Sequence, residues 1–210
     1  MSFTTVGAGY VDDGVELLGA VRPNGDRLAH ITPRFAGIVR EVRRNVGDRV
    51  RAGEVLAVLE SSESLAPYQL TTLIDGVIIE KHLTRGEAVD RETQCFVIAD
   101  LSSVWVDLAV YQKDVARVSL GQRVRVRAAE SGPEGEGTIS YLTPSLDEVT
   151  RTATARVELP NAEGQWRPGM FVAARALAEH EARLVVPTGA LQTMNGRDVV
   201  FVADEHGVEP

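Results

Sequence analysis

Gly37-Ile38-Val39, followed by Val46-Gly47-Asp48-Arg49-Val50 and Val55-Leu56-Ala57-Val58, is the stretch that decides the fold. The same pattern recurs 39 positions later as Gly76-Val77-Ile78, Arg85-Gly86-Glu87-Ala88-Val89 and Cys95-Phe96-Val97-Ile98. The two glycines of each copy are ten positions apart (37 to 47, 76 to 86), and an acidic residue follows the second glycine both times. An apolar strand, a glycine-acid turn and a second apolar strand indicate half of a β-sandwich. The two copies, at 37–59 and 76–98, therefore predict a small sandwich made of two interlocking halves.

This arrangement is typical of the biotinyl/lipoyl domain, in which carrier proteins hold a cofactor on a lysine at the turn between the halves. The turn here is Glu60-Ser61-Ser62-Glu63-Ser64, and Glu63 occupies the lysine position. An amide bond to biotin or lipoate requires an ε-amine, and the two lysines of the chain, Lys81 and Lys113, lie elsewhere. The sequence therefore excludes a swinging-arm carrier, and we expect no cofactor.

Composition and charge narrow the remaining classes. The net charge of −8 disfavours nucleic acid as a partner, because the phosphate backbone would be repelled. No segment approaches the roughly 20 apolar residues that cross a bilayer, and the chain lacks the basic and apolar regions of an export signal. The acidic pairs Asp12-Asp13 and Asp147-Glu148 lie in turn-like sequence without an associated nucleophile, so we expect no enzymatic activity.

Further short strands surround the repeat. Apolar or alternating segments at 104–110, 123–127, 137–142, 152–159 and 170–176, with two helical turns at 112–118, predict a β-barrel with one short helix over residues 100–178. We assign residues 31–99 to the lipoyl-like domain. The strand-like pieces at 9–11 and 15–19 have no partner there, so we expect them to pair with the C-terminal section. Residues 1–30 and 179–210 would then form a truncated, discontinuous β domain near the membrane, and the chain would be mainly β.

The order of these domains resembles the periplasmic adaptor subunits, or membrane-fusion proteins, of tripartite resistance-nodulation-division efflux pumps, and especially their heavy-metal branch. The resemblance includes Thr150-Arg151-Thr152 and Arg167-Pro168-Gly169-Met170. Further matching segments are 32–39, 47–50, 74–78, 86–89, 98–106, 111–114, 121–122, 143–144, 147 and 186–187. Each segment is weakly specific, but their shared order covers the chain from Thr32 to its end.

The resemblance implies an adaptor in the periplasm, associated with the inner membrane, whose export signal or anchor is absent from this chain. Its partners would be a proton-driven inner-membrane efflux transporter, an outer-membrane exit channel and further copies of itself arranged in a ring. The exported compounds would be heavy-metal cations or toxic compounds. Two alternatives stay open: an adaptor for an ATP-driven exporter, and a lipoyl-like binding module of another machine.

Adaptors of this family usually carry a long α-helical hairpin between the lipoyl halves, and here only about fifteen residues separate them. The hairpin is either naturally absent or replaced by an engineered linker. Without it, the turn at Ser61, Ser62, Glu63 and Ser64 becomes the distal end of the lipoyl-like domain. We expect any partner contact at this tip to involve these four residues, with a solvated turn as the alternative.

Other reactive or aromatic residues point to structure rather than chemistry. Cys95 is alone in an apolar run and is expected to be a buried thiol. The four histidines, His30, His82, His180 and His206, form no local metal-binding pattern, so we expect no metal site. We expect Trp105 in the core, and Trp166 in a turn, stacked on Arg167.

Overall fold

The computed structural model describes residues 7–9, 14–128, 132–177, 183–186, 188–194, 197–200, 202–204 and 207–209. The chain forms two compact units, one of Val15–Ala176 and one of Met1–Gly14 with Leu177–Pro210. In the described residues, helical structure is limited to three short 3-10 helices, η1 (Gly25–Arg27), η2 (Val115–Arg117) and η3 (Thr188–Ala190), and no helix could span a membrane. The prediction of a mainly β protein is confirmed.

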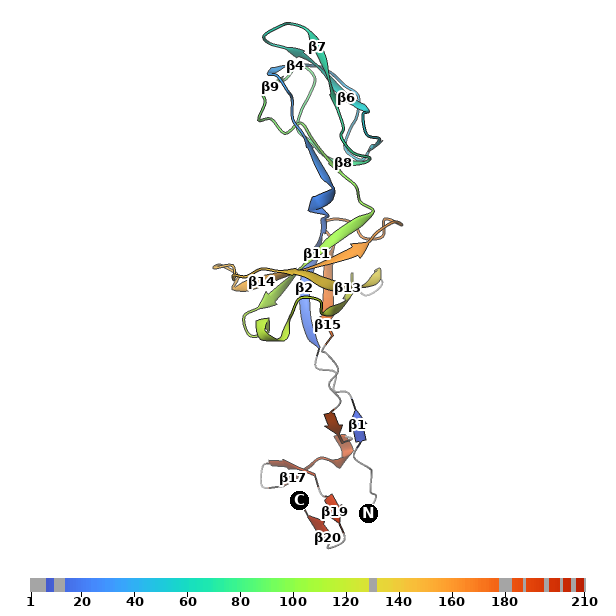
Figure 1. Cartoon of the computed structure of the whole chain (residues 1–210), viewed down its shortest axis with the longest axis vertical. Helices are drawn as coiled ribbons and strands as arrows, with labels where there is room; N and C mark the ends of the chain where they lie inside the picture. The colour runs from blue at the N-terminus through green and yellow to red at the C-terminus, as the bar shows by residue number, and fades with distance from the viewer. Residues whose placement is uncertain are drawn as a thin grey trace. The chain divides into compact units, whose positions relative to one another are not determined.

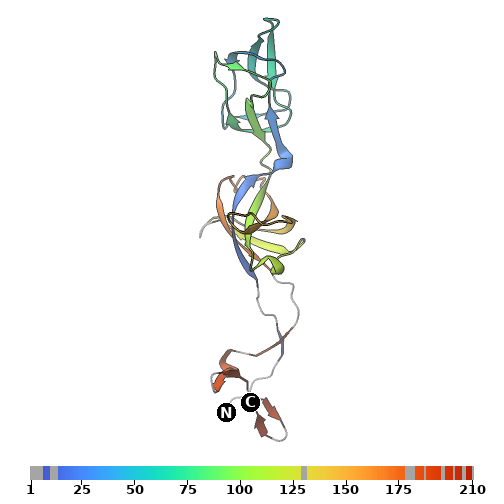
Figure 2. The same cartoon turned by 90° about the vertical axis from the view of Figure 1, so that its left-hand side faces the viewer.

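The larger unit contains a sandwich and a barrel, which are separate groups of strands (Figures 1 and 2). One sheet of the sandwich has the strand order β7 (Pro67–Thr71), β6 (Val55–Ser61), β4 (Gly37–Val42), β9 (Ala88–Val89). The other has the order β3 (Leu28–Ile31), β10 (Phe96–Ala99), β8 (Gly76–Lys81), β5 (Arg49–Val50). The short middle strand of each half pairs with the other half, β5 with β8 and β9 with β4. The predicted interlocking of two halves is therefore confirmed.

The structural repeat is longer than the sequence pattern that revealed it. A shift of 39 positions carries β3, β4, β5 and β6 onto β7, β8, β9 and β10, and it exchanges the two sheets. The added pair, β3 and β7, shares little sequence, but Ile31 and Leu70 are both buried at equivalent positions. The buried Ala29 of β3 corresponds to the only partly buried Tyr68 of β7, so one buried apolar position is shared and the sequence showed no repeat there.

The second glycine of each copy forms the same turn. Gly47 and Gly86 have φ angles of 93° and 89°, in the left-handed region that favours glycine. The N–H of Gly47 donates to Ile78 O at 2.8 Å, and the N–H of Gly86 donates to Val39 O at 2.8 Å. These bonds join the two halves of the sandwich.

The acidic residue after each of these glycines closes the turn. Asp48 accepts a hydrogen bond from the backbone N–H of Asn45 at 2.8 Å, and Glu87 accepts one from Thr84 at 2.8 Å. The repeated acidic residue thus has a structural role, because it satisfies a backbone donor in a turn.

Val39, Leu56, Leu59, Ile78 and Phe96 form the centre of the sandwich core and are almost completely buried. Cys95 is buried beside them, and burial, with smaller contributions from the nearby carboxylates, raises its pKa to about 11. The expectation of a buried, structural thiol is confirmed.

The barrel is closed by six strands. Their order is β11 (Ser103–Tyr111), β14 (Thr152–Pro160), β13 (Glu134–Leu142), β12 (Arg123–Arg127), β15 (Phe171–Ala176), β2 (Val15–Pro23). Buried valines and alanines alternate with outward residues along β12, β14 and β15, as the period-2 pattern predicted. The predicted helix at 112–118 is only the single turn η2, because the backbone is already extended at the buried Val118.

One predicted pairing is wrong. The segment at 15–19 was expected to pair with the C-terminal section, but β2 pairs with β11 and β15. Without β2, these two strands would leave open edges, so closure of the barrel requires the N-terminal strand. Residues 15–30, assigned above to the terminal domain, therefore contribute to the barrel through β2 and to the sandwich through β3.

The terminal unit contains three two-stranded sheets among the described residues. They are β1 (Gly7–Gly9) with β16 (Arg183–Val185), β17 (Gln192–Met194) with β18 (Arg197–Val199), and β19 (Val202–Asp204) with β20 (Gly207–Glu209). The pairing of β1 with β16 matches the expected pairing of Gly9 with the C-terminal section, whereas Tyr10 and Val11 lie outside the described residues.

Candidate functional site: the sandwich tip and the domain junction

The predicted tip is a tight turn between β6 and β7, and its residues have different roles. Ser61 is buried, and its Oγ accepts hydrogen bonds from the backbone N–H groups of Glu63 and Ser64, both at 3.3 Å. Ser62, Glu63 and Ser64 are exposed. Ser61 therefore shapes the turn from inside, and the other three side chains are available to a partner.

Two exposed apolar residues that the sequence pattern did not indicate, Phe35 and Leu65, lie beside the Ser61–Ser64 turn. Leu65 is 72% exposed with a φ of 56°, and Phe35 is 43% exposed. Tyr68 holds Phe35 through an edge-on ring contact with centroids 5.9 Å apart and through a hydrogen bond to its carbonyl oxygen. The guanidinium of Arg91 lies 5.8 Å from the Phe35 ring centroid. No periodic signal marked these residues, because Phe35 and Leu65 lie in turns.

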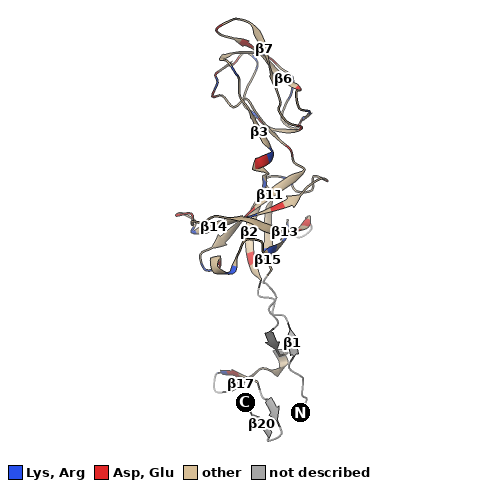
Figure 3. Cartoon of the chain, viewed as in Figure 1, with Lys and Arg blue, Asp and Glu red and all other residues tan. Residues whose placement is uncertain are grey.

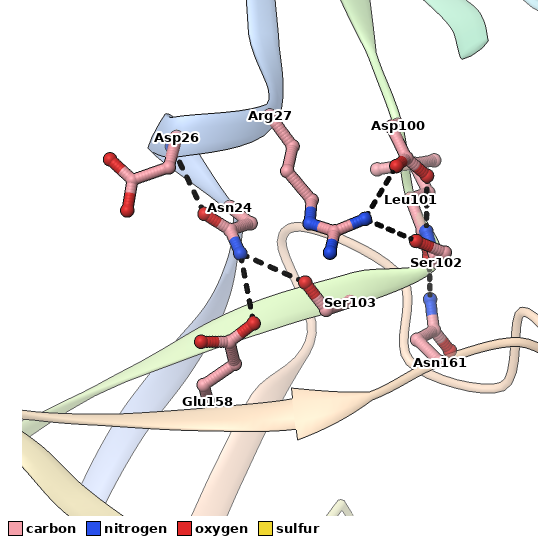
Figure 4. Close-up of polar contacts among 9 residues, drawn as sticks. All are labelled: Asn24, Asp26, Arg27, Asp100, Leu101, Ser102, Ser103, Glu158 and Asn161. Carbon is pink, nitrogen blue, oxygen red and sulfur yellow. Dashed lines mark hydrogen bonds and ion pairs between the residues drawn. The ribbon is translucent and has the colours of Figure 1, made fainter. Parts of the chain in front are cut away.

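The opposite end of the sandwich joins the barrel through a buried amide (Figure 4). The Nδ2 of Asn24 donates to Ser103 Oγ at 2.8 Å and to Glu158 Oε1 at 3.1 Å. Its Oδ1 accepts the N–H of Asp26 at 3.0 Å. Asn24 thus ties the segment after β2 to both β11 and β14.

The two chain segments that connect sandwich and barrel are also tied to each other. Arg27 donates to Asp100 Oδ2 at 2.7 Å and to Ser102 Oγ at 3.0 Å, and the N–H of Asp100 donates to Arg27 O at 3.0 Å. The backbone N–H of Ser102, its side chain and Arg27 together hold the pKa of Asp100 below its usual value. The same contacts that lower this pKa link the two connecting segments to each other.

Asn161, in the turn after β14, completes the junction from the barrel side. Its backbone N–H donates to Ser102 O at 2.7 Å, and its Nδ2 donates to Leu101 O at 3.0 Å and to Trp166 O at 2.8 Å. Its Oδ1 accepts the N–H of Trp166 at 2.8 Å. Buried amide and backbone groups are all paired in this network, so the junction is a specific arrangement.

The structure places Trp166 in a turn as expected, but buried rather than stacked on Arg167, and the expectation that Trp105 lies in the core is wrong. Trp166 is buried in the barrel core, where the Asn161 network holds its backbone. Trp105 is only partly buried, and its ring lies 3.9 Å from the guanidinium carbon of Arg156, which also binds Asp107 at 2.7 Å. The alternation in β11 indicated this outcome, because Trp105 is out of phase with the buried Val104 and Val106.

An open cleft of about 1470 Å³ lies beside the junction, between the sandwich and the barrel turn that contains Asn161. Charges of both signs line it, including Arg49, Arg51, Asp75 and Glu163. Basic and acidic residues are likewise interspersed over the sandwich and the barrel (Figure 3).

The other candidate residues are engaged in local contacts. His30 contacts Gln94 and His82 contacts Glu80, both at 2.9 Å, while His180 and His206 lie outside the described residues. The carboxylate of Asp147 accepts the backbone N–H groups of Val149 and Thr150 within a turn. Within the described ranges, no three His, Cys, Asp or Glu side chains gather in a way that could hold a metal ion.

Comparison with protein families gives two adjacent matches. Residues 27–100 match a CzcB-like barrel-sandwich hybrid domain, and residues 103–180 match a CusB-like beta-barrel domain. These boundaries meet in the junction between Ala99 and Ser103, where the structure changes from sandwich to barrel.

Curated relatives align with almost the whole chain. The cobalt-zinc-cadmium resistance protein CzcB of Cupriavidus metallidurans is 33% identical over 277 positions, which cover 98% of this chain and 53% of that protein. The nickel and cobalt resistance protein CnrB of the same species is 24% identical over 94% of this chain and 68% of its own length. The chain thus spans about half the length of CzcB, and the alignment has more positions than the 210 residues of this chain. CzcB therefore carries residues within the aligned region that this chain lacks.

Solved structures share the fold. ZneB from Cupriavidus metallidurans has a TM-score of 0.70 and 20% identity, and the match covers 80% of this chain and all of ZneB. MacA from Actinobacillus actinomycetemcomitans has a TM-score of 0.74 and 13% identity, with 99% of this chain and 95% of MacA covered.

Proposed function

We propose that this chain, which belongs to the family of heavy-metal membrane-fusion proteins that includes CzcB, CnrB and NccB, is a periplasmic adaptor of an efflux pump. It would hold a proton-driven inner-membrane transporter and connect it to an outer-membrane exit channel. The alignment of 98% of the chain with CzcB, with both domains in the same order, carries this proposal.

The structure supports a role in assembly. The lipoyl-like sandwich presents no amine at its tip, where Glu63 stands, and Lys81 is engaged with Asn45 at 2.8 Å on β8. Buried amides and an ion pair join the sandwich to the barrel at Asn24, Arg27 and Asn161. Contacts that order both connecting segments suit a protein that bridges two partners.

The tip is the proposed contact with the exit channel or with a neighbouring copy. Ser62, Glu63 and Ser64 supply hydrogen-bonding groups, and Leu65 and Phe35 add the apolar area that the polar turn alone does not provide. Cations such as cobalt, zinc, cadmium and nickel, named in the relatives, are the proposed exported substrates.

Complementation tests this function directly. The chain, fused to a periplasmic export signal, is expressed in cells that lack their own adaptor but retain the transporter and the channel. Restored growth in zinc or cobalt is expected, together with co-purification of the transporter. Growth no better than with an empty vector would overturn the proposal, and recovery of only an ATP-binding-cassette transporter would replace the partner.

A further inference from the structure

The outer wall of the barrel has an apolar groove of about 500 Å³ across β15, β2 and β11, with Thr154 of β14 at its edge. Leu18 is 65% exposed and Phe171 is 85% exposed, and the groove between them is lined almost entirely by apolar atoms. In register, Phe171 lies opposite Ala20, and Leu18 lies opposite Ala109, so two large side chains flank two small ones. Large apolar side chains that gather in this way on a barrel wall indicate a contact surface.

The same barrel carries an apolar projection. The loop between β13 and β14 presents Val149, which is 91% exposed, together with the partly exposed Leu146. Asp147 Oδ1 accepts the N–H of Val149 at 3.0 Å and the N–H of Thr150 at 2.8 Å. These bonds hold Val149 outward before any contact is made, which lowers the entropic cost of binding.

Groove and projection are separate but neighbouring surfaces of the barrel. In the strand order, β11 at the edge of the groove pairs with β14, whose Thr154 also lines the groove, and the projection lies at the end of the β13–β14 hairpin. Figure 1 shows the β13–β14 hairpin extending beyond its neighbouring strands. Val149, Leu18 and Phe171 all remain exposed, so the projection does not fill the groove of its own copy.

One pair of charges beside the two surfaces is complementary, although the acidic Asp107 and Glu16 also lie at or near the groove. Glu148 is exposed next to Val149, and Arg22 is exposed on β2, two residues beyond Ala20 on the same face. Neither side chain forms an ion pair with another described residue. A projection seated in the groove of another copy can therefore place opposite charges at the edge of an apolar contact.

We propose that Val149 of one copy docks between Leu18 and Phe171 of a second copy, with Glu148 beside Arg22. This inference rests on the proposed adaptor function, since it supplies the contact by which copies assemble around a transporter. Two different surfaces of one chain meet head to tail in this contact, and such contacts produce a closed ring or an open filament.

Cysteine cross-linking tests the contact. The full chain with both Val149→Cys and Leu18→Cys is oxidised with copper phenanthroline, and its multimers are separated on a denaturing gel. The native Cys95 is buried, so it contributes little background. Val149→Cys with Glu134→Cys is the matched control, because Glu134 is exposed on β13.

A ladder of multimers is expected from the test pair, at about ten times the yield of the control pair, since docking raises the local thiol concentration. Adding Phe171→Glu should reduce the ladder to the control level, whereas Phe171→Leu should keep it. Arg22→Glu should weaken the ladder, and Arg22→Glu with Glu148→Arg should restore it. A yield equal to the control overturns the proposal, as does cross-linking of Leu18→Cys only to the transporter.

Growth of the complemented cells in metal, measured beside the cross-linking, distinguishes a wrong contact from a wrong adaptor function. If the unmodified chain restores tolerance but the test pair does not cross-link, the contact is wrong and the adaptor function stands. If the ladder forms while the unmodified chain fails to restore tolerance, the contact stands and the adaptor function is wrong.

Discussion

Replacing the first or the second glycine of a sandwich half should lower the stability of the protein, and the physical reason should differ between the two positions. A Cβ atom at Gly37 would lie 2.2 Å from Glu60 O on the paired strand, and one at Gly76 would lie 2.5 Å from Ala99 O. A Cβ atom at Gly47 or Gly86 would meet nothing within 4 Å, but the φ angles there are 93° and 89°. The first glycine of each half is therefore required by space, and the second by backbone torsion.

The expected magnitudes follow from these two mechanisms. Gly47→Ala forces an alanine into the left-handed region and should cost about 1–2 kcal/mol of unfolding free energy. Gly47→Asn should cost less, because asparagine tolerates that region. Gly37→Ala pushes β4 away from β6 and should cost about 3 kcal/mol or more, and Gly37→Asn should be worse because its side chain is larger.

Urea denaturation with two probes measures these costs. Amide hydrogen exchange of β4 and β6 follows the sandwich. Tryptophan fluorescence follows the barrel, because both Trp105 and Trp166 lie there. All four variants should affect the sandwich more than the barrel. If Asn is worse than Ala at position 47, or milder than Ala at position 37, the separation of the two mechanisms is refuted.

Three further predictions concern the tip, the junction and the core thiol. Ser61→Ala should cost about 1 kcal/mol in urea denaturation, because two backbone donors lose their acceptor, whereas Glu63→Ala should leave stability unchanged; equal effects would contradict the buried role of Ser61. Because the pKa of folded Asp100 is lowered, its stabilising contribution is present above the ordinary carboxyl pKa and is lost as the pH falls through the folded value. The stability of Asp100→Asn should therefore vary less with pH below about 4 than that of the unmodified chain, and identical pH profiles would contradict this. Cys95 should react with maleimide at neutral pH only in denaturant, since its pKa is raised to about 11 and it is buried; rapid labelling of the folded chain would contradict the assignment.

Local requirements made the sandwich predictable from sequence. Its glycines, acidic turn residues and apolar strands satisfy needs within a few residues of each other, and those needs occur twice. The barrel pairing of β2 was not predictable in this way, because its partners β11 and β15 lie far from Val15–Pro23 in the sequence and no local pattern marks the pairing. The burial of Trp166 likewise depends on Asn161 and on the connecting segment at Leu101. The partial exposure of Trp105 could have been predicted, since Trp105 has the same strand parity as the outward Asp107.

The repeat also relates the two candidate sites to each other. A shift of 39 positions carries Ser61 at the tip onto Asp100 at the junction, and both side chains accept a backbone N–H from two residues later, Glu63 and Ser102. The same turn chemistry therefore ends both halves of the sandwich, and only the following chain differs: after Ser61 it returns into β7, and after Asp100 it enters the barrel. Asp100 additionally binds Arg27, which brings in the second connecting segment. A serine can close a free turn, but its hydroxyl cannot supply the negative charge that pairs with an arginine across two segments. We infer that the difference between serine and aspartate at these equivalent positions separates a free tip from an anchored end.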